Sequence, residues 1–281
     1  MTATTDDKAI HDGYYILATA SRRDERTRVI KQGDSFGVFD HAGMIGQAGM
    51  GELGLYHDDT RYLSMFEIAL ERRRPLLLNS TVLRDNILNV DLANPDLPDR
   101  AEPLARDSVH LFVQSFLWDR GWHARLELHN YALHAVEIEL SLLFDADFAD
   151  VFEVRGTRRS RRGERLHDSV TESYRMRYRG LDGVERRTRV SWSRTPDSAE
   201  PGTITFLLSL APRASAEIEL SIACEIDGAA KLTGSFDSAV TTTRQRLAAR
   251  AEKGCQHANH QNCILHYYLL VASLLNCVTR R

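Results

Sequence analysis

Alternation of apolar and polar residues, repeated many times between residues 13 and 227, constrains the fold more than any other feature of this sequence. A period of two places successive side chains on opposite faces, so each run predicts a strand with one buried face. The first three clear runs have short connections and predict an antiparallel meander. Because so many strands need a second sheet to cover their apolar faces, we expect an all-β fold, a large antiparallel β-sandwich. The clearest runs are 108–118, 123–129, 136–142, 174–178, 188–192, 204–210 and 216–222.

The pattern changes to a helical one near the C-terminus. Ser235 is expected to cap a helix that ends near Gly254, a residue type that favours helix termination. Residues 264–278 are apolar on almost all sides but shorter than the roughly 20 residues that a bilayer requires, so they predict a packed helix and no membrane span. We therefore expect a flexible N-terminus over residues 1–12, a β-sandwich over 13–232 and a helical tail over 233–281.

Composition excludes several classes of partner. The chain has 36 Lys and Arg against 39 Asp and Glu, so no net field attracts nucleic acid or an anionic membrane. The glycine-rich residues 41–53 lack the lysine-serine pair of a phosphate-binding loop, and we expect no cofactor. Residues 1–10 do not resemble a secretory signal, and the four cysteines lie in the last quarter of the chain. A cytoplasmic protein with reduced thiols is expected.

The densest group of polar and aromatic residues lies in residues 54–63. Its candidate substrate-binding residues are Tyr56, His57, Asp59, Arg61 and Tyr62. A tyrosine ring can support a sugar ring while an aspartate and an arginine supply directional hydrogen bonds, so the group suits a carbohydrate surface. The alternative is structural, because Asp59 and Arg61 share a strand face and can form a salt bridge that fixes a hairpin.

Carboxylates that would suit glycoside hydrolysis are poorly arranged in the sequence. The reaction needs two carboxyl groups facing one sugar, roughly 5 to 9.5 Å apart. Asp58 and Asp59 are adjacent, and on a strand they would face opposite ways. Asp145 and Asp147 would share a strand face, where their like charges would favour one neutral acid if they are buried or a bound cation if they are open. The alternative is that both lie at a solvated strand end. We therefore assign no catalytic residue.

A run of arginines between residues 155 and 165 raises the possibility of nucleic-acid binding. The run contains no interleaved aromatic residue, and Glu153, Glu164 and Asp168 flank it. A solvated loop or an inter-domain contact is the favoured interpretation. We expect no nucleic-acid partner.

Cysteine and histidine cluster between residues 255 and 263. Cys255, His257, His260 and Cys263 suggest zinc by residue type. On a helix they do not share one face, and their spacing matches no standard zinc finger. We therefore expect no metal site.

Six segments of the chain form a pattern when they are taken together: residues 54–64, 73–80, 91–96, 144–156, 180–183 and 186–189. In this order they resemble the N-terminal domain of bacterial and archaeal glycogen-debranching enzymes of the amylo-α-1,6-glucosidase type. The resemblance extends over roughly residues 30–227, which makes it more specific than a single short motif. It implies a supersandwich-like β domain that precedes a helical-barrel glycosidase domain, with α-glucan or that barrel as partner.

The chain departs from this family pattern after the sandwich. Members continue into a long helical barrel that carries the catalytic carboxylates, whereas this sequence ends at Arg281. The helical tail 233–281 is interpreted as a linker, as the truncated start of such a barrel or as a frameshifted end. The expected function is that of a non-catalytic N-terminal domain that supports or contacts α-glucan, while hydrolysis of α-1,6 linkages is implied only for the full-length parent. The alternatives are a stand-alone glucan-binding or protein-interaction module and a nonfunctional truncated product.

Overall fold

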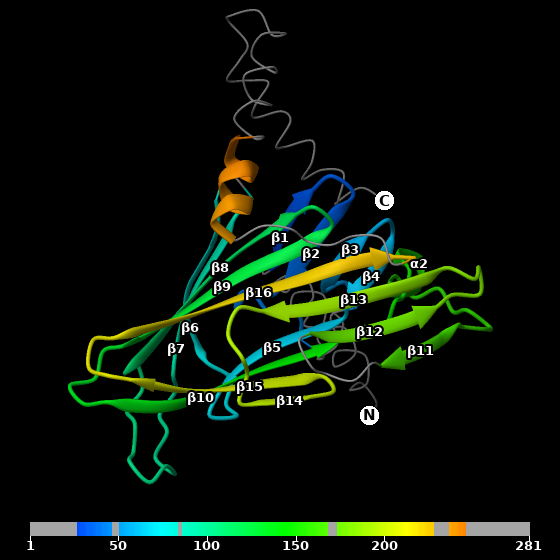
Figure 1. Cartoon of the computed structure of the whole chain (residues 1–281). Coiled ribbons are helices and arrows are strands. Elements are labelled where there is room, and N and C mark those ends of the chain that lie inside the picture. Colours follow the sequence, from blue (N-terminus) through cyan, green and yellow to red (C-terminus); the bar gives the residue numbers. More distant parts are fainter. Residues whose placement is uncertain (1–26, 47–50, 84–85, 168–172, 228–235, 246–281) are drawn as a thin grey trace, which may run out of the picture. The chain divides into compact units, whose positions relative to one another are not determined.

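A computed structural model of the chain describes residues 27–46, 51–83, 86–167, 173–227 and 236–245 (Figure 1). The chain divides into two compact units, Met1–Thr233 and Gly234–Arg281. In the second unit, residues 236–245 are α-helical, while Ser235, Gly254 and the apolar run 264–278 lie outside the described residues. Within the described ranges, no helix is long and apolar enough to cross a membrane.

One layer of the first unit is an antiparallel sheet of eight strands. Its strands are β6 (Leu76–Val82), β7 (Leu88–Ala93), β8 (Val109–Trp118), β9 (Gly121–Asn130), β11 (Glu164–His167), β12 (Tyr174–Arg179), β13 (Glu185–Trp192) and β16 (Ser215–Ile226). Their order across the sheet is β11-β12-β13-β16-β9-β8-β7-β6. Alternation explains the buried face, because Val109, Leu111 and Val113 of β8 are buried while the residues between them are partly exposed.

Two smaller sheets, each of four antiparallel strands, form the facing layer (Figure 1). The first, in the order β1-β2-β3-β4, consists of β1 (Arg28–Gln32), β2 (Ser35–Phe39), β3 (Gly54–His57) and β4 (Thr60–Leu63). The second, in the order β14-β15-β10-β5, consists of β5 (Met65–Leu70), β10 (Val136–Asp145), β14 (Ser198–Glu200) and β15 (Thr203–Leu210). An isolated bridge joins Ile45, in the connection between β2 and β3, to Phe66 of β5.

Aromatic contacts join the layers in the core. The ring of Trp122 on β9 lies 5.4 Å from that of Phe39 on β2 and 4.9 Å from that of Phe66 on β5. All three side chains are almost completely buried, so this cluster removes a large apolar area from water. The predicted large antiparallel β-sandwich is therefore confirmed.

The predicted meander of three strands is wrong in its third member. β8 and β9 pair as expected, but β10 crosses to the other layer and pairs with β15 and β5. The buried side chain of Asn130 fixes the crossing, since its amide donates to the carbonyls of His134, Leu210 and Ala211. β16 takes the place beside β9 instead.

Candidate functional site

The predicted site segment forms the hairpin of β3 and β4. Asp58 and Asp59 make its turn, with φ angles of 44° and 58°. Two successive positive φ angles are those of a two-residue type I′ turn, and aspartate tolerates this conformation better than most residues. The expectation that these two acids lie on a strand and face opposite ways is therefore corrected.

Arg61 holds the hairpin to two other segments. Its Nε donates to Asp147 Oδ1 at 3.0 Å, its Nη2 donates to the second oxygen of the same carboxylate, and its Nη1 donates to the carbonyl of Gly51 at 2.8 Å. Burial lowers the pKa of Arg61 and the hydrogen bond and charge of Asp147 raise it, with a net increase. The side chain crosses Gly54, where a Cβ would lie 2.5 Å from Arg61 Cδ.

The expected alternative of an Asp59–Arg61 salt bridge is replaced by this Asp147–Arg61 pair. Asp145, the other acid of its segment, pairs with Arg165. Asp145 and Asp147 thus have separate arginine partners, so they do not face a common sugar or cation as a free carboxylate pair.

Backbone hydrogen bonds attach the hairpin to the chain that follows β10. The amide of Arg61 donates to the carbonyl of Ala149 at 2.8 Å, and that of Val151 donates to the carbonyl of Asp59 at 2.9 Å. Thr60 also bridges Asp150, which caps the short helix α2 (Val151–Val154). Two segments far apart in sequence, 54–64 and 144–156, are thereby joined into one structural element.

Tyr56 and Tyr62 point into the protein. They are 2% and 0% exposed, so neither offers a free ring face to a ligand. Tyr56 stacks on Phe36 at 4.5 Å and donates to the carbonyl of Glu52, and burial raises its pKa to about 12. Tyr62 packs edge-on against Phe148. Both rings pack on the buried side of the hairpin and stabilise it.

His57 is also buried and lies between Ser35 and Asp58. Its Nδ1 is 2.9 Å from Ser35 Oγ, while its Nε2 is 3.2 Å from Asp58 Oδ2 without hydrogen-bond alignment. Burial lowers the pKa of His57, so the ring is neutral at neutral pH. Although the residue types match a nucleophile, a base and an acid, Ser35 is only 3% exposed. A nucleophile must reach its substrate, and this set does not meet that condition.

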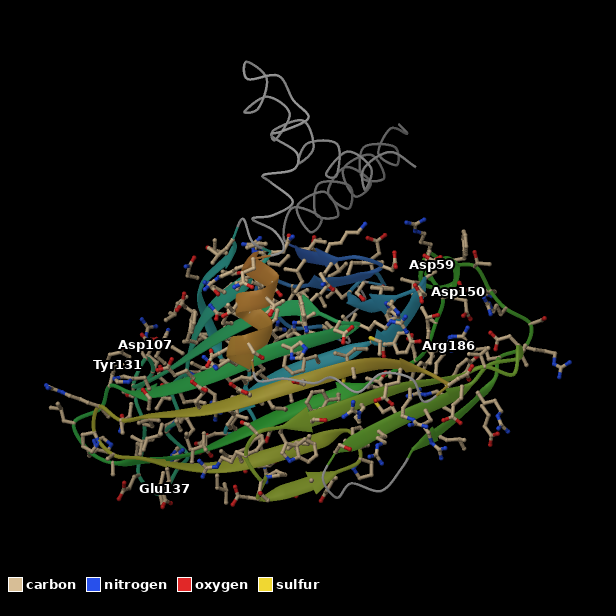
Figure 2. The ribbon with its side chains drawn as sticks, turned by 45° about the horizontal axis from the view of Figure 1, so that its top comes forward. Asp59, Asp107, Tyr131, Glu137, Asp150 and Arg186 are labelled. Carbon is tan, nitrogen blue, oxygen red and sulfur yellow. The ribbon has the colours of Figure 1, made fainter. Side chains whose placement is uncertain are left out.

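The surface above these buried residues presents a different aromatic ring. Phe152 of α2 is 65% exposed and follows Val151, which is bonded to Asp59. The carboxylate of Asp59 has no partner among the residues that the structure describes. We call the surface formed by Asp59, Phe152 and residues 155–162 the hairpin end. Figure 2 shows Asp59, Asp150 and Arg186 at this end of the sandwich and Tyr131 at the opposite end.

The arginine run borders the hairpin end as an exposed loop. Arg159 pairs with Asp150, and Arg162 pairs with Glu153 at 3.1 Å. Arg155, Arg158 and Arg161 are exposed without a partner within the described ranges. The loop therefore combines internal ion pairs with guanidinium groups that remain available for contacts.

The sequence did not single out Phe152. An aromatic residue in a short turn gives no periodic pattern, and only the position of α2 beside the hairpin reveals its exposure. The capping box at Asp150 and Glu153 was a readable signal for the helix, but not for the direction of the ring.

A metal site is not formed by the described part of the chain, where no three His, Cys, Asp or Glu side chains gather suitably. Cys255, His257, His260 and Cys263 lie outside it. Cys224, on β16, is a buried free thiol whose pKa is raised by burial.

The fold is that of a β-sandwich domain, and the candidate site lies at one end of it. Residues 30–221 match the family described as the N-terminal domain of (some) glycogen debranching enzymes. This match spans more than half of the chain, so the chain belongs to that family, as the resemblance predicted. It is thereby an N-terminal domain of a carbohydrate-enzyme family.

Solved structures with a similar course of the chain include three proteins of low sequence identity. A putative kojibiose phosphorylase from human microbiome is 12% identical with a TM-score of 0.46, and the match covers 78% of this chain and 32% of that one. The Slr1438 protein of Synechocystis sp. PCC 6803 is 9% identical with a TM-score of 0.44, covering 71% and 95%. A putative aldose 1-epimerase of Escherichia coli K12 is 9% identical with a TM-score of 0.37, covering 71% and 98%.

The sequence identities and TM-scores of these three structures are too low to indicate the function of the chain. The chain spans only about a third, 32%, of the phosphorylase chain. A comparison with curated proteins finds no match.

Proposed function

We propose that the chain acts as the non-catalytic N-terminal β-sandwich of an amylo-α-1,6-glucosidase-like debranching protein, and that its hairpin end contacts α-glucan. The supporting observation is that the unpartnered Asp59 carboxylate and the exposed Phe152 ring belong to two segments that the backbone bond from Val151 to Asp59 joins. A sugar offers an apolar ring face and hydroxyl donors, which a phenyl ring and a carboxylate complement. Hydrolysis of α-1,6 linkages in the intact protein, by residues of another domain, is part of this proposal.

The five residues predicted from the sequence have two roles in this proposal. Asp59 contacts the glucan directly. Arg61 and His57 hold the hairpin turn in position, and the buried rings of Tyr56 and Tyr62 support it. Their effect on binding is therefore indirect, through the position of Asp59 and α2.

A catalytic helical barrel is a second candidate partner for the same surface. The observation that favours it is the set of exposed guanidinium groups on Arg155, Arg158 and Arg161, which suit an acidic protein surface. A stand-alone glucan-binding module would use the same hairpin end. The domain limits 1–12, 13–232 and 233–281 and a cytoplasmic location remain predictions.

Electrophoresis in native gels cast with glycogen tests the proposal. We expect glycogen to retard the wild-type chain, and Phe152→Ala to weaken the interaction roughly tenfold, equivalent to about 1.4 kcal/mol. Asp59→Asn tests the carboxylate at the same end. Tyr131→Ala is the matched control, since Tyr131 is 62% exposed at the opposite end of the sandwich. Mobility of the wild type unaffected by glycogen, or equal retardation of Phe152→Ala, would contradict glucan contact at this surface.

A further inference from the structure

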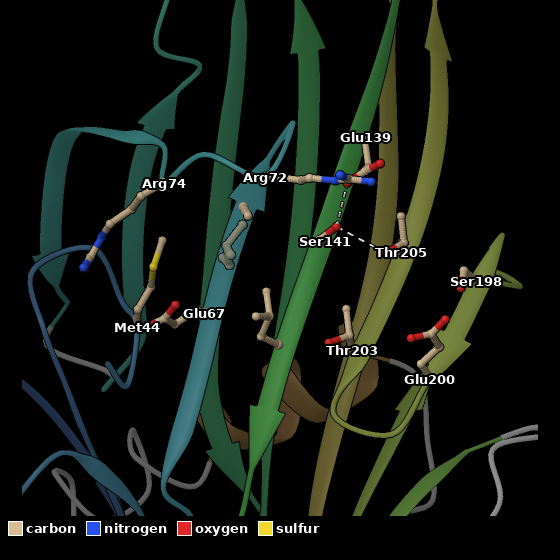
Figure 3. A pocket seen from close by; sticks show the side chains of 13 residues that line it. Met44, Glu67, Arg72, Arg74, Glu139, Ser141, Ser198, Glu200, Thr203 and Thr205 are labelled. Carbon is tan, nitrogen blue, oxygen red and sulfur yellow. Dashed lines mark hydrogen bonds and ion pairs between the residues drawn. The ribbon is translucent and has the colours of Figure 1, made fainter. Parts of the chain in front are cut away.

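An open groove lies on the outer face of the sheet β14-β15-β10-β5, a surface distinct from the hairpin end (Figure 3). Its volume is about 500 Å³, and a second hollow of about 410 Å³ adjoins it through Arg72 and Glu139. The first volume lies within the range typical of small-molecule sites. The connected hollows suit an extended ligand.

The strand register explains the shape of the groove. One row across the sheet consists of Glu67, Leu143, Thr203 and Glu200, and the next consists of Ala69, Ser141, Thr205 and Ser198. Alternation points all eight side chains to the outer face. The side chains in the middle of both rows are small or medium-sized and form the floor of the groove; they are Leu143, Thr203, Ser141 and Thr205. Glu67 and Glu200 lie on opposite sides of this floor (Figure 3). With strands about 4.8 Å apart, the backbones of these two acids are roughly 14 Å apart.

The groove contains hydrogen-bonding groups that the protein itself does not use. The side chains of Glu67, Glu200 and Thr203 have no partner among the described residues. By contrast, the Oγ of Ser141, which is 7% exposed, lies 3.2 Å from both Glu139 Oε1 and Thr205 Oγ1. Internal hydrogen bonds thus hold Ser141 and Thr205 in the floor, while the carboxylates of Glu67 and Glu200 at its sides and the hydroxyl group of Thr203 remain available.

The charges restrict the class of ligand. Three carboxylates, on Glu67, Glu139 and Glu200, line the groove together with two guanidinium groups, on Arg72 and Arg74. Arg72 lies 3.7 Å from Glu139, and Arg74 pairs with Asp40. A polyanion would meet the two unpaired acids, so the groove disfavours nucleic acid and phosphate-rich ligands. Acceptors, hydroxyl groups and a small apolar surface at Leu143 instead complement a neutral ligand with many hydroxyl groups.

From these features we infer that the groove is a second saccharide subsite, which binds a neutral oligosaccharide across β5, β10, β15 and β14. Glu67 and Glu200 accept hydrogen bonds from sugar hydroxyls, Thr203 bonds a unit lying over the floor, and Arg72 donates to sugar oxygens at the junction with the adjoining hollow. The choice of an α-glucan as the sugar rests on the proposed function. The geometry of the groove does not depend on the hairpin end.

Calorimetric titration of the whole chain with maltoheptaose tests this subsite. The double variant Thr203→Val/Glu200→Gln removes a hydroxyl and a carboxylate charge from the groove. Thr81→Val/Glu127→Gln is its matched control, because both residues are exposed on strands of the other layer. Circular dichroism checks that each variant is folded. We expect the groove variant to bind roughly tenfold more weakly, and the control to bind like the wild type.

Phe152→Ala, measured in parallel, separates this inference from the proposed function. Weakening by the groove variant supports the subsite, whatever Phe152→Ala does. Wild-type affinity in the groove variant overturns the subsite, and in that case weakening by Phe152→Ala still supports the hairpin end. Absence of heat with the wild type up to about 10 mM sugar also overturns the subsite. A dissociation constant of 1 mM corresponds to a binding free energy of only about 4 kcal/mol, so this range of concentration covers even weak binding. Contact of the hairpin end with a catalytic barrel is then tested by co-purification.

Discussion

Arg61 joins the β3–β4 hairpin to the chain after β10 through its side chain and its backbone. The guanidinium makes two parallel bonds to Asp147, while the amide donates to Ala149. The two charged side chains are 14% and 23% exposed, so solvent screens their attraction only partly. Because lysine lacks the planar fork, it cannot reproduce both bonds.

Substitution of Arg61 is expected to destabilise the chain in graded steps. We expect Arg61→Lys to lower the free energy of unfolding by about 1–2 kcal/mol and Arg61→Ala by about 2–3 kcal/mol, because the second leaves Asp147 unpaired. Urea unfolding measures both. Arg106→Lys is the control. Arg106 is 67% exposed, and its ion pair with Asp107 is loose, with a distance of 3.6 Å between Nε and Oδ2. Equal stability of Arg61→Ala and the wild type would show that the pair contributes nothing.

His123 is expected to make the chain sensitive to acid. Burial lowers its pKa from 6.5 to about 4, because the charged ring would lose its hydration. Between these pH values the unfolded chain therefore binds more protons than the folded chain. As a result, the free energy of unfolding falls as the pH is lowered from about 7 to 4, and His123 accounts for at most about 3 kcal/mol of this loss. The lowered pKa of His57 acts in the same direction.

His123→Phe tests this assignment by unfolding at several pH values. The variant should have a smaller slope of stability against pH over that interval. The ring of Phe116 stacks on His123 at 5.4 Å, so phenylalanine retains an aromatic contact. An unchanged slope would assign the acid sensitivity to other groups.

At the scale of elements, the sequence predicted strands well and their partners less well. The runs at 108–118 and 136–142 became β8 and β10, because alternation reports which face of a strand is buried. Alternation does not report which sheet covers that face. The transfer of β10 to the other layer depends on Asn130, a polar residue that the sequence pattern marks only as a turn.

Asn130→Ala tests the importance of this crossing. The side chain is 0% exposed, and its oxygen also accepts from the amide of Ala132. Removing it takes a donor from the buried Leu210 carbonyl and the side-chain acceptor from the Ala132 amide, so we expect a loss of about 2–4 kcal/mol in the free energy of unfolding. Asn79→Ala is the control, because Asn79 is exposed and makes a long 3.4 Å contact with Asp91. A loss no larger than that of the control would contradict the role of Asn130.

The candidate site was predictable as a segment but not as a surface. Residues 54–63 form the β3–β4 hairpin, but Tyr56 and Tyr62 face inward and Arg61 pairs with Asp147 instead of Asp59. Alternation in a four-residue strand is too short to distinguish the two faces when β3 is buried on both. The exposure of Phe152 depends on a contact between segments that lie far apart in the sequence.

At the scale of the whole molecule, the family match and the position of the hairpin end support one account. The segments 54–64 and 144–156 both lie in the matched region and are bonded to one another. They carry the exposed ring and the unpartnered carboxylate at one end of the sandwich, where a glucan or a second domain has access. Under the proposed function, this domain holds substrate while another domain cleaves it.

Hydrogen exchange of the whole chain, with and without saturating maltoheptaose, tests the proposed glucan contact most directly. We predict slower amide exchange in residues 57–61 and 149–155 when the sugar is bound, and unchanged exchange around Tyr131 at the opposite end. At a sugar concentration near the dissociation constant of the wild type, Phe152→Ala should reduce the change at the hairpin end. Unaltered exchange in residues 57–61 and 149–155 at saturating sugar would contradict the assignment of the hairpin end as a glucan-contacting surface.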